Sequence, residues 1–244
     1  MQFKPDLSPA GFQQVLASST YPPMELYLQT GLQEGAWYWD GLEPYVRIPW
    51  RRFTGPDGTK LYGQCIKAHD THLKIVRHIH PSHDSILDVG GYDGIWAWLF
   101  AARRKVVLDI CQEALERWAA IHSEIICEDG GNIGKLYQEN EFDVVFLIDV
   151  LEHMKATSAL RAIRAAERIA KYQVVVATPD GWWPFDDWQS IITKDSDVPC
   201  AELMAHKSGW GHEFFEGRGY QVIIQPGLHG DLGMGDGLVA FFNK

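Results

Sequence analysis

Two different spacings of apolar residues alternate along most of the chain. Short runs rich in valine, isoleucine and phenylalanine have the length and composition of buried strands, and the segments between them show helical spacing. Residues 156–170 form the clearest helix, because good helix formers fill several turns. Strands alternating with helices predict an α/β fold with a mostly parallel, Rossmann-like sheet and helices on both faces. The strands are predicted at 85–89, 105–109, 124–127, 142–148 and 172–177.

The two ends of the chain depart from this alternation. Residues 221–225 and 238–242 are apolar runs joined by a glycine-rich stretch without room for a helix, which predicts a hairpin and an antiparallel C-terminal edge strand. Residues 1–67 are rich in proline, tyrosine and tryptophan and lack long periodic runs. We expect them to form short helices and loops, an irregular cap packed on a main domain at 68–244.

Composition narrows the class of protein. A chain of 244 residues with 46% hydrophobic and 22% charged residues is long enough for a full core, and no apolar run is long enough to span a bilayer. We therefore expect a soluble protein without a membrane partner. The N-terminus lacks the pattern of a secretory signal, which favours a cytoplasmic location.

The four cysteines and the net charge narrow the class of protein further. The cysteines are Cys65, Cys111, Cys127 and Cys200. No two of them form a Cys-x-x-Cys pair, so a zinc site or a disulfide framework has little support. We expect each cysteine to pack as a small buried apolar residue. The formal net charge of −10 would repel a polyanion, which disfavours nucleic acid and favours a small-molecule partner.

A glycine-rich loop follows the first predicted strand. Residues 88–94 read Asp-Val-Gly-Gly-Tyr-Asp-Gly and precede a helical pattern at 95–102. Glycine permits positive φ and lets a ligand approach the backbone, although an ordinary tight βα turn would use it equally. Asp88 and Asp93 would repel the pyrophosphate of a dinucleotide but attract a cationic amino acid and a sulfonium. The sign of the charge therefore favours S-adenosylmethionine over NAD.

Asp109 supports this cofactor because it ends the second predicted strand. It lies roughly 20 residues beyond Asp88, where a carboxylate accepts hydrogen bonds from ribose hydroxyls. A strand-ending aspartate could instead cap the helix that begins near Cys111. The joint occurrence of Asp88, the glycines and Asp109 favours the cofactor.

Residues 85 to about 177 resemble the seven-stranded class I methyltransferases that use S-adenosylmethionine. Residues 141–153, Glu-Phe-Asp-Val-Val-Phe-Leu-Ile-Asp-Val-Leu-Glu-His, are similar to that family's fourth strand and the following loop. Residues 174–180, Val-Val-Val-Ala-Thr-Pro-Asp, are similar to its fifth strand. The resemblance implies these cofactor-binding residues: Asp88, Gly90, Gly91, Tyr92, Gly94, Asp109, Ile110, Asp129, Gly130 and Asp149.

The resemblance also implies a role for most of these positions. Asp88 and the glycines would shape the pocket for the methionine part of the cofactor, and Asp149 would lie beside the same part. Asp109 would bind the ribose and Ile110 would pack on the adenine. Asp129 would accept a hydrogen bond from the adenine amino group, a role for which Glu128 competes.

Tyr92 departs from the family pattern. Many relatives carry a second glycine of the loop at this position. A tyrosine can still line the pocket and offer its ring face to the sulfonium. Its role stays open.

Catalysis by in-line methyl transfer depends mainly on positioning, and a base is needed only if the acceptor is protonated. Histidine is the first candidate, and three histidines follow strands at the ligand-binding end of the sheet: His153, His206 and His212. A structural role at the start of the next helix is the favoured alternative for His153, and a first-turn helix position is the alternative for His212. Residues 206–215 resemble a segment of methyltransferases encoded with surface-polysaccharide enzymes.

Two further groups of residues bear on the site. The histidines between 69 and 83 lack a completing carboxylate or cysteine, so we expect a polar helix face and no metal. Tryptophans above a sheet can wall a dry acceptor pocket or pack the N-terminal region onto the core. The candidates for the pocket are Trp182, Trp183 and Trp210.

These observations favour a methyltransferase that acts on a small-molecule acceptor, most simply on an oxygen of a sugar or secondary metabolite. The loop at 148–151 lacks the Asn-Pro-Pro-Tyr pattern of enzymes that methylate base amino groups and the Pro-Cys nucleophile of cytosine methylation. Two alternatives stay open, an NAD-linked oxidoreductase and a noncatalytic binding module. The acceptor, the choice of oxygen or nitrogen and the oligomeric state are not determined.

Overall fold

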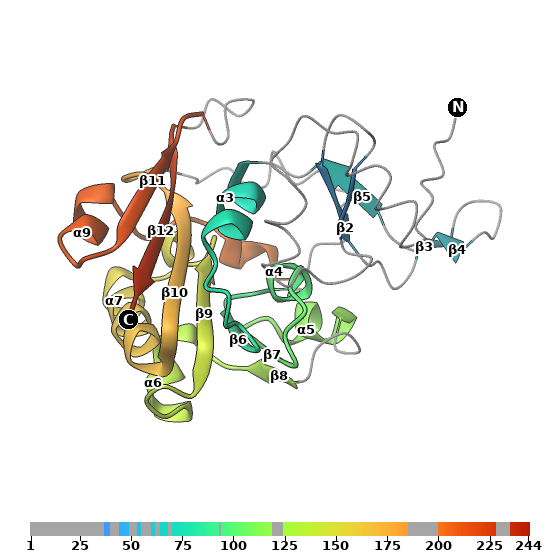
Figure 1. Ribbon diagram of the computed structural model, residues 1–244, viewed down its shortest axis with the longest axis horizontal. Helices are drawn as coiled ribbons and strands as arrows, with labels where there is room; N and C mark the ends of the chain where they lie inside the picture. The colour runs from blue at the N-terminus through green and yellow to red at the C-terminus, as the bar shows by residue number, and fades with distance from the viewer. Residues whose placement is uncertain are drawn as a thin grey trace.

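The computed structural model describes residues 70–118 except 93, then 124–184, 200–227 and 235–244, and five short strands between 37 and 67. Its central feature is a seven-stranded sheet in the order β11-β12-β10-β9-β6-β7-β8 (Figure 1). The strands are β6 (Ser85–Val89), β7 (Arg104–Asp109), β8 (Glu124–Cys127), β9 (Phe142–Ile148), β10 (Ala170–Pro179), β11 (Gln221–Gln225) and β12 (Gly237–Asn243). The predicted α/β fold is confirmed, and every predicted strand is present.

Strand directions place the predicted antiparallel strand in the pair at one edge of the sheet. Strands β6, β7, β8, β9 and β10 pair in parallel, and β12 is antiparallel to both β10 and β11. The hairpin β11–β12 therefore forms as predicted, but the antiparallel strand lies one place in from the edge. The edge strand itself, β11, runs in the direction of the parallel strands, because the chain reverses only afterwards, in the hairpin that leads into β12.

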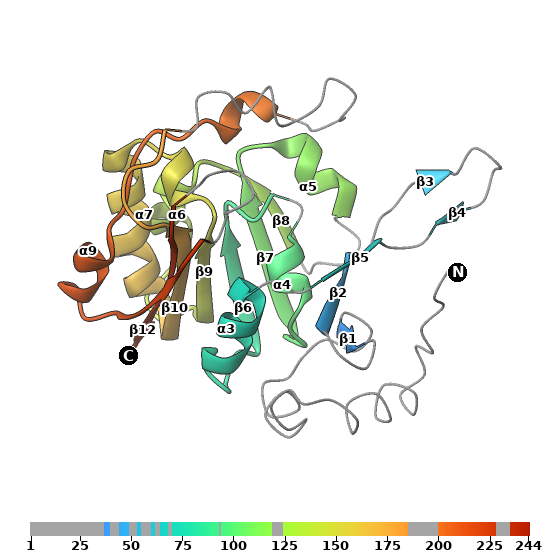
Figure 2. The same ribbon diagram turned by 90° about the horizontal axis from the view of Figure 1, so that it is seen from above.

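Helices cover both faces of the sheet (Figure 2). Successive residues of β9 show why: Phe146 belongs to a core cluster with Ile75 and Trp96 on one face, and Leu147 belongs to a second cluster with Ile133 and Ile163 on the other. The α-helices of the described core are α3 (Asp70–His78), α4 (Ile95–Trp98), α5 (Gln112–Trp118), α6 (Ile133–Leu136), α7 (Ala156–Ile169) and α9 (His212–Glu216). None of the described helices is both long and apolar enough to cross a membrane.

Helix α4 is shorter than the predicted 95–102. The amides of Leu99 and Phe100 bond to carbonyls three residues back, at 3.2 and 3.4 Å, so the last turn tightens and ends. The fully buried Phe100 then fixes the chain against the core before β7 begins.

The described part of the N-terminal region contains strands, which corrects the expectation of short helices and loops there. Strands β1 (Trp37–Trp39), β2 (Pro44–Ile48) and β5 (Gln64–Lys67) form an antiparallel sheet, and β3 (Phe53–Thr54) pairs with β4 (Lys60–Leu61). Aromatic and β-branched residues in these segments favour strands once a partner is available. Most of residues 1–67 lies outside the described part, so the cap boundary stays a prediction.

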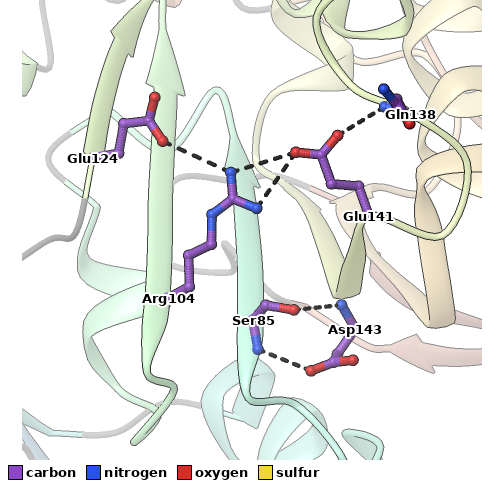
Figure 3. Close-up of polar contacts among 6 residues, drawn as sticks. All are labelled: Ser85, Arg104, Glu124, Gln138, Glu141 and Asp143. Atoms are coloured by element: carbon purple, nitrogen blue, oxygen red, sulfur yellow. Dashed lines mark hydrogen bonds and ion pairs between the residues drawn. The ribbon is translucent and has the colours of Figure 1, made fainter.

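Polar contacts at the amino ends of the strands set the register of the sheet (Figure 3). Ser85 and Asp143 begin the pairing of β6 with β9: the Ser85 amide donates to Asp143 Oδ2 at 3.0 Å, and the Asp143 amide donates to Ser85 Oγ at 2.9 Å. The Arg104 guanidinium lies 3.4 Å from Glu141 and 3.8 Å from Glu124, between β9 and β8. Because the register is set here, the opposite ends of β6 and β9 finish level with each other.

We predict that Asp143→Ala lowers the free energy of unfolding by about 1 kcal/mol, because the Ser85 amide loses its acceptor. Asp143→Asn keeps an acceptor oxygen and should lose clearly less. Urea denaturation of both variants and the wild type measures the difference. Equal losses of unfolding free energy in the two variants would show that the hydrogen bond from the Ser85 amide to Asp143 does not stabilise the protein.

Candidate functional site

A cavity of about 430 Å³ opens at the carboxyl ends of four parallel strands. Gly90, Ile110, Glu128 and Asp149 line it, and each follows one of β6, β7, β8 and β9. The chain reverses its order in the sheet between β6 and β9, which is where open α/β sheets bind ligands. The predicted residues that line the cavity are Gly90, Tyr92, Asp109, Ile110, Asp129, Gly130, Asp149 and His153.

Gly90 is the point of closest packing in this wall. Its φ is 69°, in the left-handed region, and its amide donates to the Leu108 carbonyl at 2.7 Å. A Cβ at this position would lie 2.0 Å from Cγ2 of Val150, in the loop after β9. Glycine is therefore required here both by backbone conformation and by space.

Asp88, Gly91 and Gly94 support the loop from behind and do not line the cavity. Asp88 is fully buried, and its Oδ2 accepts from the Ala97 amide of α4 at 3.1 Å. A Cβ at Gly91 would lie 2.7 Å from the Asp88 carboxyl carbon. Their packing and hydrogen bonds hold the shape of the loop, and their contact with the cofactor stays a prediction. Asp93 lies outside the described residues.

Asp109 holds two loops and also faces the cavity. Its Oδ2 accepts from the Tyr92 amide at 2.9 Å, and its Oδ1 accepts from the Cys111 amide at 2.7 Å. Burial raises the pKa of Asp109, and these backbone hydrogen bonds oppose that rise. The capping alternative and the ligand-binding prediction are thus compatible, because each carboxylate oxygen can accept more than one hydrogen bond.

The backbone at Tyr92 has a conformation that favours glycine. Its φ is 50°, in the left-handed region that costs a side chain about 1 kcal/mol or more. The bond from its amide to Asp109 holds it there. The residue lines the cavity, as the resemblance implies for this loop.

An exposed apolar side chain and two acidic residues lie at one part of the cavity. Ile110 is 55% exposed and lines the cavity. Asp129 caps the following 3₁₀ helix η2 (Gly130–Asn132) by accepting from the Gly131 amide at 2.7 Å. Glu128 accepts from the Asp129 amide and from Asn132, and the Asn132 bond is the main reason that its pKa is lowered. Both acidic residues line the cavity, so the competition between them stays open.

A segment distant in sequence forms part of the wall. The 3₁₀ helix η4 (Ala201–Met204) brings Leu203 and Met204 to the cavity, and Lys207 follows them. Cys111 and Cys200 form a disulfide across 89 residues, which corrects the expectation of unpaired buried cysteines. Both of these cysteines line the cavity. Sequence spacing could not reveal this pair, because the fold alone brings the two segments together.

Acidic residues and a histidine gather where β9 ends. Asp149 has a φ of 49° and is exposed to the cavity, yet it lies deep enough for desolvation to raise its pKa. Glu152 is 4% exposed, and burial together with the nearby Asp149 carboxylate raises its pKa. Burial, then repulsion from His206, lowers the pKa of His153 to about 4. The His153 imidazole is therefore neutral near pH 7.

The three candidate catalytic histidines separate into two places. His153 lines the cavity, and His206 lies beside it with the ring centroids 5.0 Å apart. His212, at the start of α9, does not line the cavity, and its Nδ1 lies 2.9 Å from Oδ2 of Asp180. That bond is the main reason that the pKa of His212 is raised.

The three predicted tryptophans are not among the residues that line the cavity, and their role in binding an acceptor stays a prediction. Trp210 is 5% exposed and belongs to the core, where its indole N–H donates to Ser208 Oγ at 2.9 Å. Trp182 is 58% exposed, and neither it nor Trp183 is among the residues lining the cavity. The side chains that form this wall come instead from η4 and from the loop after β9: Val150, Met154, Lys155, Ser158, Leu203, Met204 and Lys207.

Fold and cavity together define a class I, Rossmann-like methyltransferase domain. Residues 63–227 match the family model described as a methyltransferase domain. The chain belongs to this family, and its cofactor is S-adenosylmethionine. The cavity fits this cofactor: its volume lies in the range of small-molecule sites, with carboxylates and the exposed Ile110 along its wall.

Solved structures with a similar fold are methyltransferases of several kinds. A methyltransferase dependent on S-adenosylmethionine from Archaeoglobus fulgidus is 13% identical, with a TM-score of 0.47 over 70% of this chain and 92% of that chain. The N-methyltransferase NodS from Bradyrhizobium japonicum is 14% identical, with a TM-score of 0.48 over 72% and 94%. The small RNA methyltransferase HEN1 is 16% identical, with a TM-score of 0.44 over 67% and 23%. The comparison with curated proteins found no match.

We predict that Gly90→Ala destabilises the protein by about 2 kcal/mol or more, because overpacking against Val150 adds to backbone strain. Gly219→Ala is the matched control, since Gly219 also has positive φ, 86°, but a Cβ there meets nothing within 4 Å. It should cost about 1 kcal/mol from strain alone. Urea denaturation measures both, and isothermal titration with S-adenosylhomocysteine should show weaker binding for Gly90→Ala only. A Gly90→Ala variant as stable as Gly219→Ala would contradict the close contact.

A second prediction concerns the left-handed backbone at Tyr92. Tyr92→Val should be less stable than Tyr92→Gly by about 1 kcal/mol or more, because a β-branched residue is poorly accommodated there. Thermal and urea denaturation compare the two variants. If valine is tolerated as well as glycine, the backbone at Tyr92 is not held in this conformation.

Proposed function

We propose that this methyltransferase transfers the methyl group of S-adenosylmethionine to a hydroxyl oxygen of a small molecule, such as a sugar or a secondary metabolite. The observation that carries the proposal is the histidine-bearing wall of the cavity. His153 lies on the 3₁₀ helix η3 (Leu151–His153), and Lys207 follows η4. Most cofactor roles implied by the resemblance fall on the loops after β6, β7 and β8, which leaves the side formed by η3 and the segment after η4 for an acceptor.

The cofactor would lie along the carboxyl ends of β6, β7 and β8. Asp109 would bind the ribose, Ile110 would pack on the adenine, and Asp129 or Glu128 would accept from the adenine amino group. Asp149 would lie beside the methionine part. The buried Asp88 would act indirectly, by holding the glycine loop against α4.

When bound, S-adenosylmethionine would supply the methyl group and would be left as the neutral thioether S-adenosylhomocysteine. The acceptor oxygen would gain the methyl carbon and would lose its proton to water. Alignment of this oxygen with the methyl carbon supplies much of the acceleration. A neutral His153 ring can accept a hydrogen bond from the hydroxyl and orient it. Its low pKa suits this positioning role better than strong basicity.

Charge supports a small acceptor. The chain carries a formal net charge of −10, which repels long polyanions. Lys155 and Lys207 place cationic groups at the cavity itself, so an anionic substituent on a small acceptor would be attracted locally.

The direct test measures formation of S-adenosylhomocysteine with hydroxylated sugars and phenols, matched amine analogues and a small RNA. Methyl transfer to the hydroxyl compounds supports the proposal. Transfer only to amines or to RNA would overturn it. Failure to bind S-adenosylhomocysteine at all would favour a noncatalytic module.

We predict that His153→Gln lowers kcat at least about tenfold while the affinity for S-adenosylhomocysteine stays within about threefold, since the ring faces the acceptor. His80→Gln is the control, because His80 stacks on Tyr172 near the opposite end of the sheet. It should leave both quantities unchanged. Unchanged turnover in His153→Gln would remove this histidine from the acceptor side.

A further inference from the structure

Three side chains of metal-binding type converge beside the cavity. Glu152, His153 and His206 each offer one ligand atom, and these atoms all lie within 4.8 Å of one another. No other such group occurs in the described residues. We propose that these three residues form a binding site for a divalent transition-metal ion, which the sequence did not suggest.

Both imidazoles are oriented as metal ligands usually are. His206 Nδ1 lies 2.9 Å from the Trp183 carbonyl oxygen, and His153 Nδ1 lies 3.4 Å from that of Ala205. A carbonyl only accepts, so Nδ1 donates in each ring, and Nε2 of the neutral ring carries the lone pair. Metal-binding histidines typically donate their other ring N–H to a carbonyl or carboxylate in this way.

The carboxylate is held in place as well. Glu152 is buried, and its Oε2 accepts from Thr178 Oγ1 at 3.1 Å. Asp149, three residues earlier, adds a second carboxylate near this position. Buried carboxylates are stabilised by a neighbouring cation, which makes the cluster a favourable place for a positive ion.

The fold builds this cluster without help from an ion. The amides of Lys207 and Ser208 donate to the Glu152 carbonyl at 2.6 and 3.2 Å. Ser208 Oγ donates to the Leu151 carbonyl at 2.8 Å. These bonds tie the segment after η4 to η3, so His206 is brought beside His153 by the backbone. A site that is preorganised in this way loses less conformational entropy when it binds an ion.

The ligand set indicates the kind of metal. Two imidazoles and one carboxylate, with further positions open, are the set that catalytic zinc and non-haem iron(II) use. Ligand atoms around a four-coordinate ion lie about 3 to 3.5 Å apart, given metal–ligand bonds of about 2.0 to 2.2 Å. The three ligand atoms lie within 4.8 Å of one another, so any pair beyond that separation would have to close in when an ion binds. We therefore expect Zn²⁺, Co²⁺ or Mn²⁺ to bind.

The position of the ion deepens the function proposed above, and this part rests on that function. His153 lines the cavity, so an ion bound to it lies next to the acceptor space. The acceptor hydroxyl would then bind the ion directly, in place of its hydrogen bond to the His153 ring. Metal coordination orients an oxygen and lowers the pKa of its proton.

Metal binding is tested with the ion alone, without cofactor or acceptor. Protein freed of metal with a chelator is titrated with CoCl₂ and ZnCl₂, followed by calorimetry and by the visible absorption of Co²⁺. We expect one ion per chain and a raised Tm in its presence. His206→Gln and Glu152→Gln should each weaken binding by about tenfold to a hundredfold or more.

Two control variants test whether metal binds elsewhere on the chain. His80→Gln removes a histidine outside the cluster, and Cys127→Ser removes the exposed free thiol. Both should bind metal as the wild type does. Absence of binding by the wild type would overturn the site, and so would wild-type affinity in a folded His206→Gln variant. His206 is only partly buried, so this variant should fold even if Glu152→Gln does not.

Methyl transfer is measured separately, with and without the chelator. Metal binding without any effect on transfer leaves the metal site standing and overturns the link to the acceptor. Methyl transfer to an amine instead of a hydroxyl would overturn the proposed function. It would not change the metal binding that calorimetry measures.

Discussion

The contact between Gly90 and Val150 is the constraint on which the cofactor cavity depends. It joins the loop after β6 to the loop after β9, at the place where the sheet reverses its order of strands. Only a residue without a Cβ lets these loops meet. Because Ser85 and Asp143 set the register at the other end, the two loops arrive level, with Asp149 next to the glycine turn.

Local strain accompanies this packing. Tyr92 and Asp149 both have a left-handed backbone without being glycine, and both line the cavity. Hydrogen bonds hold them: the Tyr92 amide donates to Asp109, and the Asp149 amide donates to the Ala177 carbonyl at 2.9 Å. Strain of this kind persists only where surrounding structure enforces it, and it is common at functional sites.

The wall formed by η4 and the segment after it gives the cavity its individual chemistry. The Cys111–Cys200 disulfide and the bonds from Lys207 and Ser208 to Glu152 attach this wall to the sheet. It contributes apolar side chains and a lysine to the cavity and brings His206 beside His153, and the glycine loop could specify none of these. The loops after the parallel strands therefore form one part of the cavity wall, and this later segment forms another.

The sequence by itself determined the α/β fold, the strands and the loop that shapes the cofactor cavity. These are local properties, since strand and helix spacing, positive-φ glycines and strand-ending carboxylates are visible within a few residues. The tertiary structure decided that Trp210 is a core residue, that His212 lies away from the cavity, and that His206 meets His153. It also decided the disulfide and the place of β12 within the sheet. Each of these depends on how segments far apart in the chain pack together, and no local pattern records such contacts.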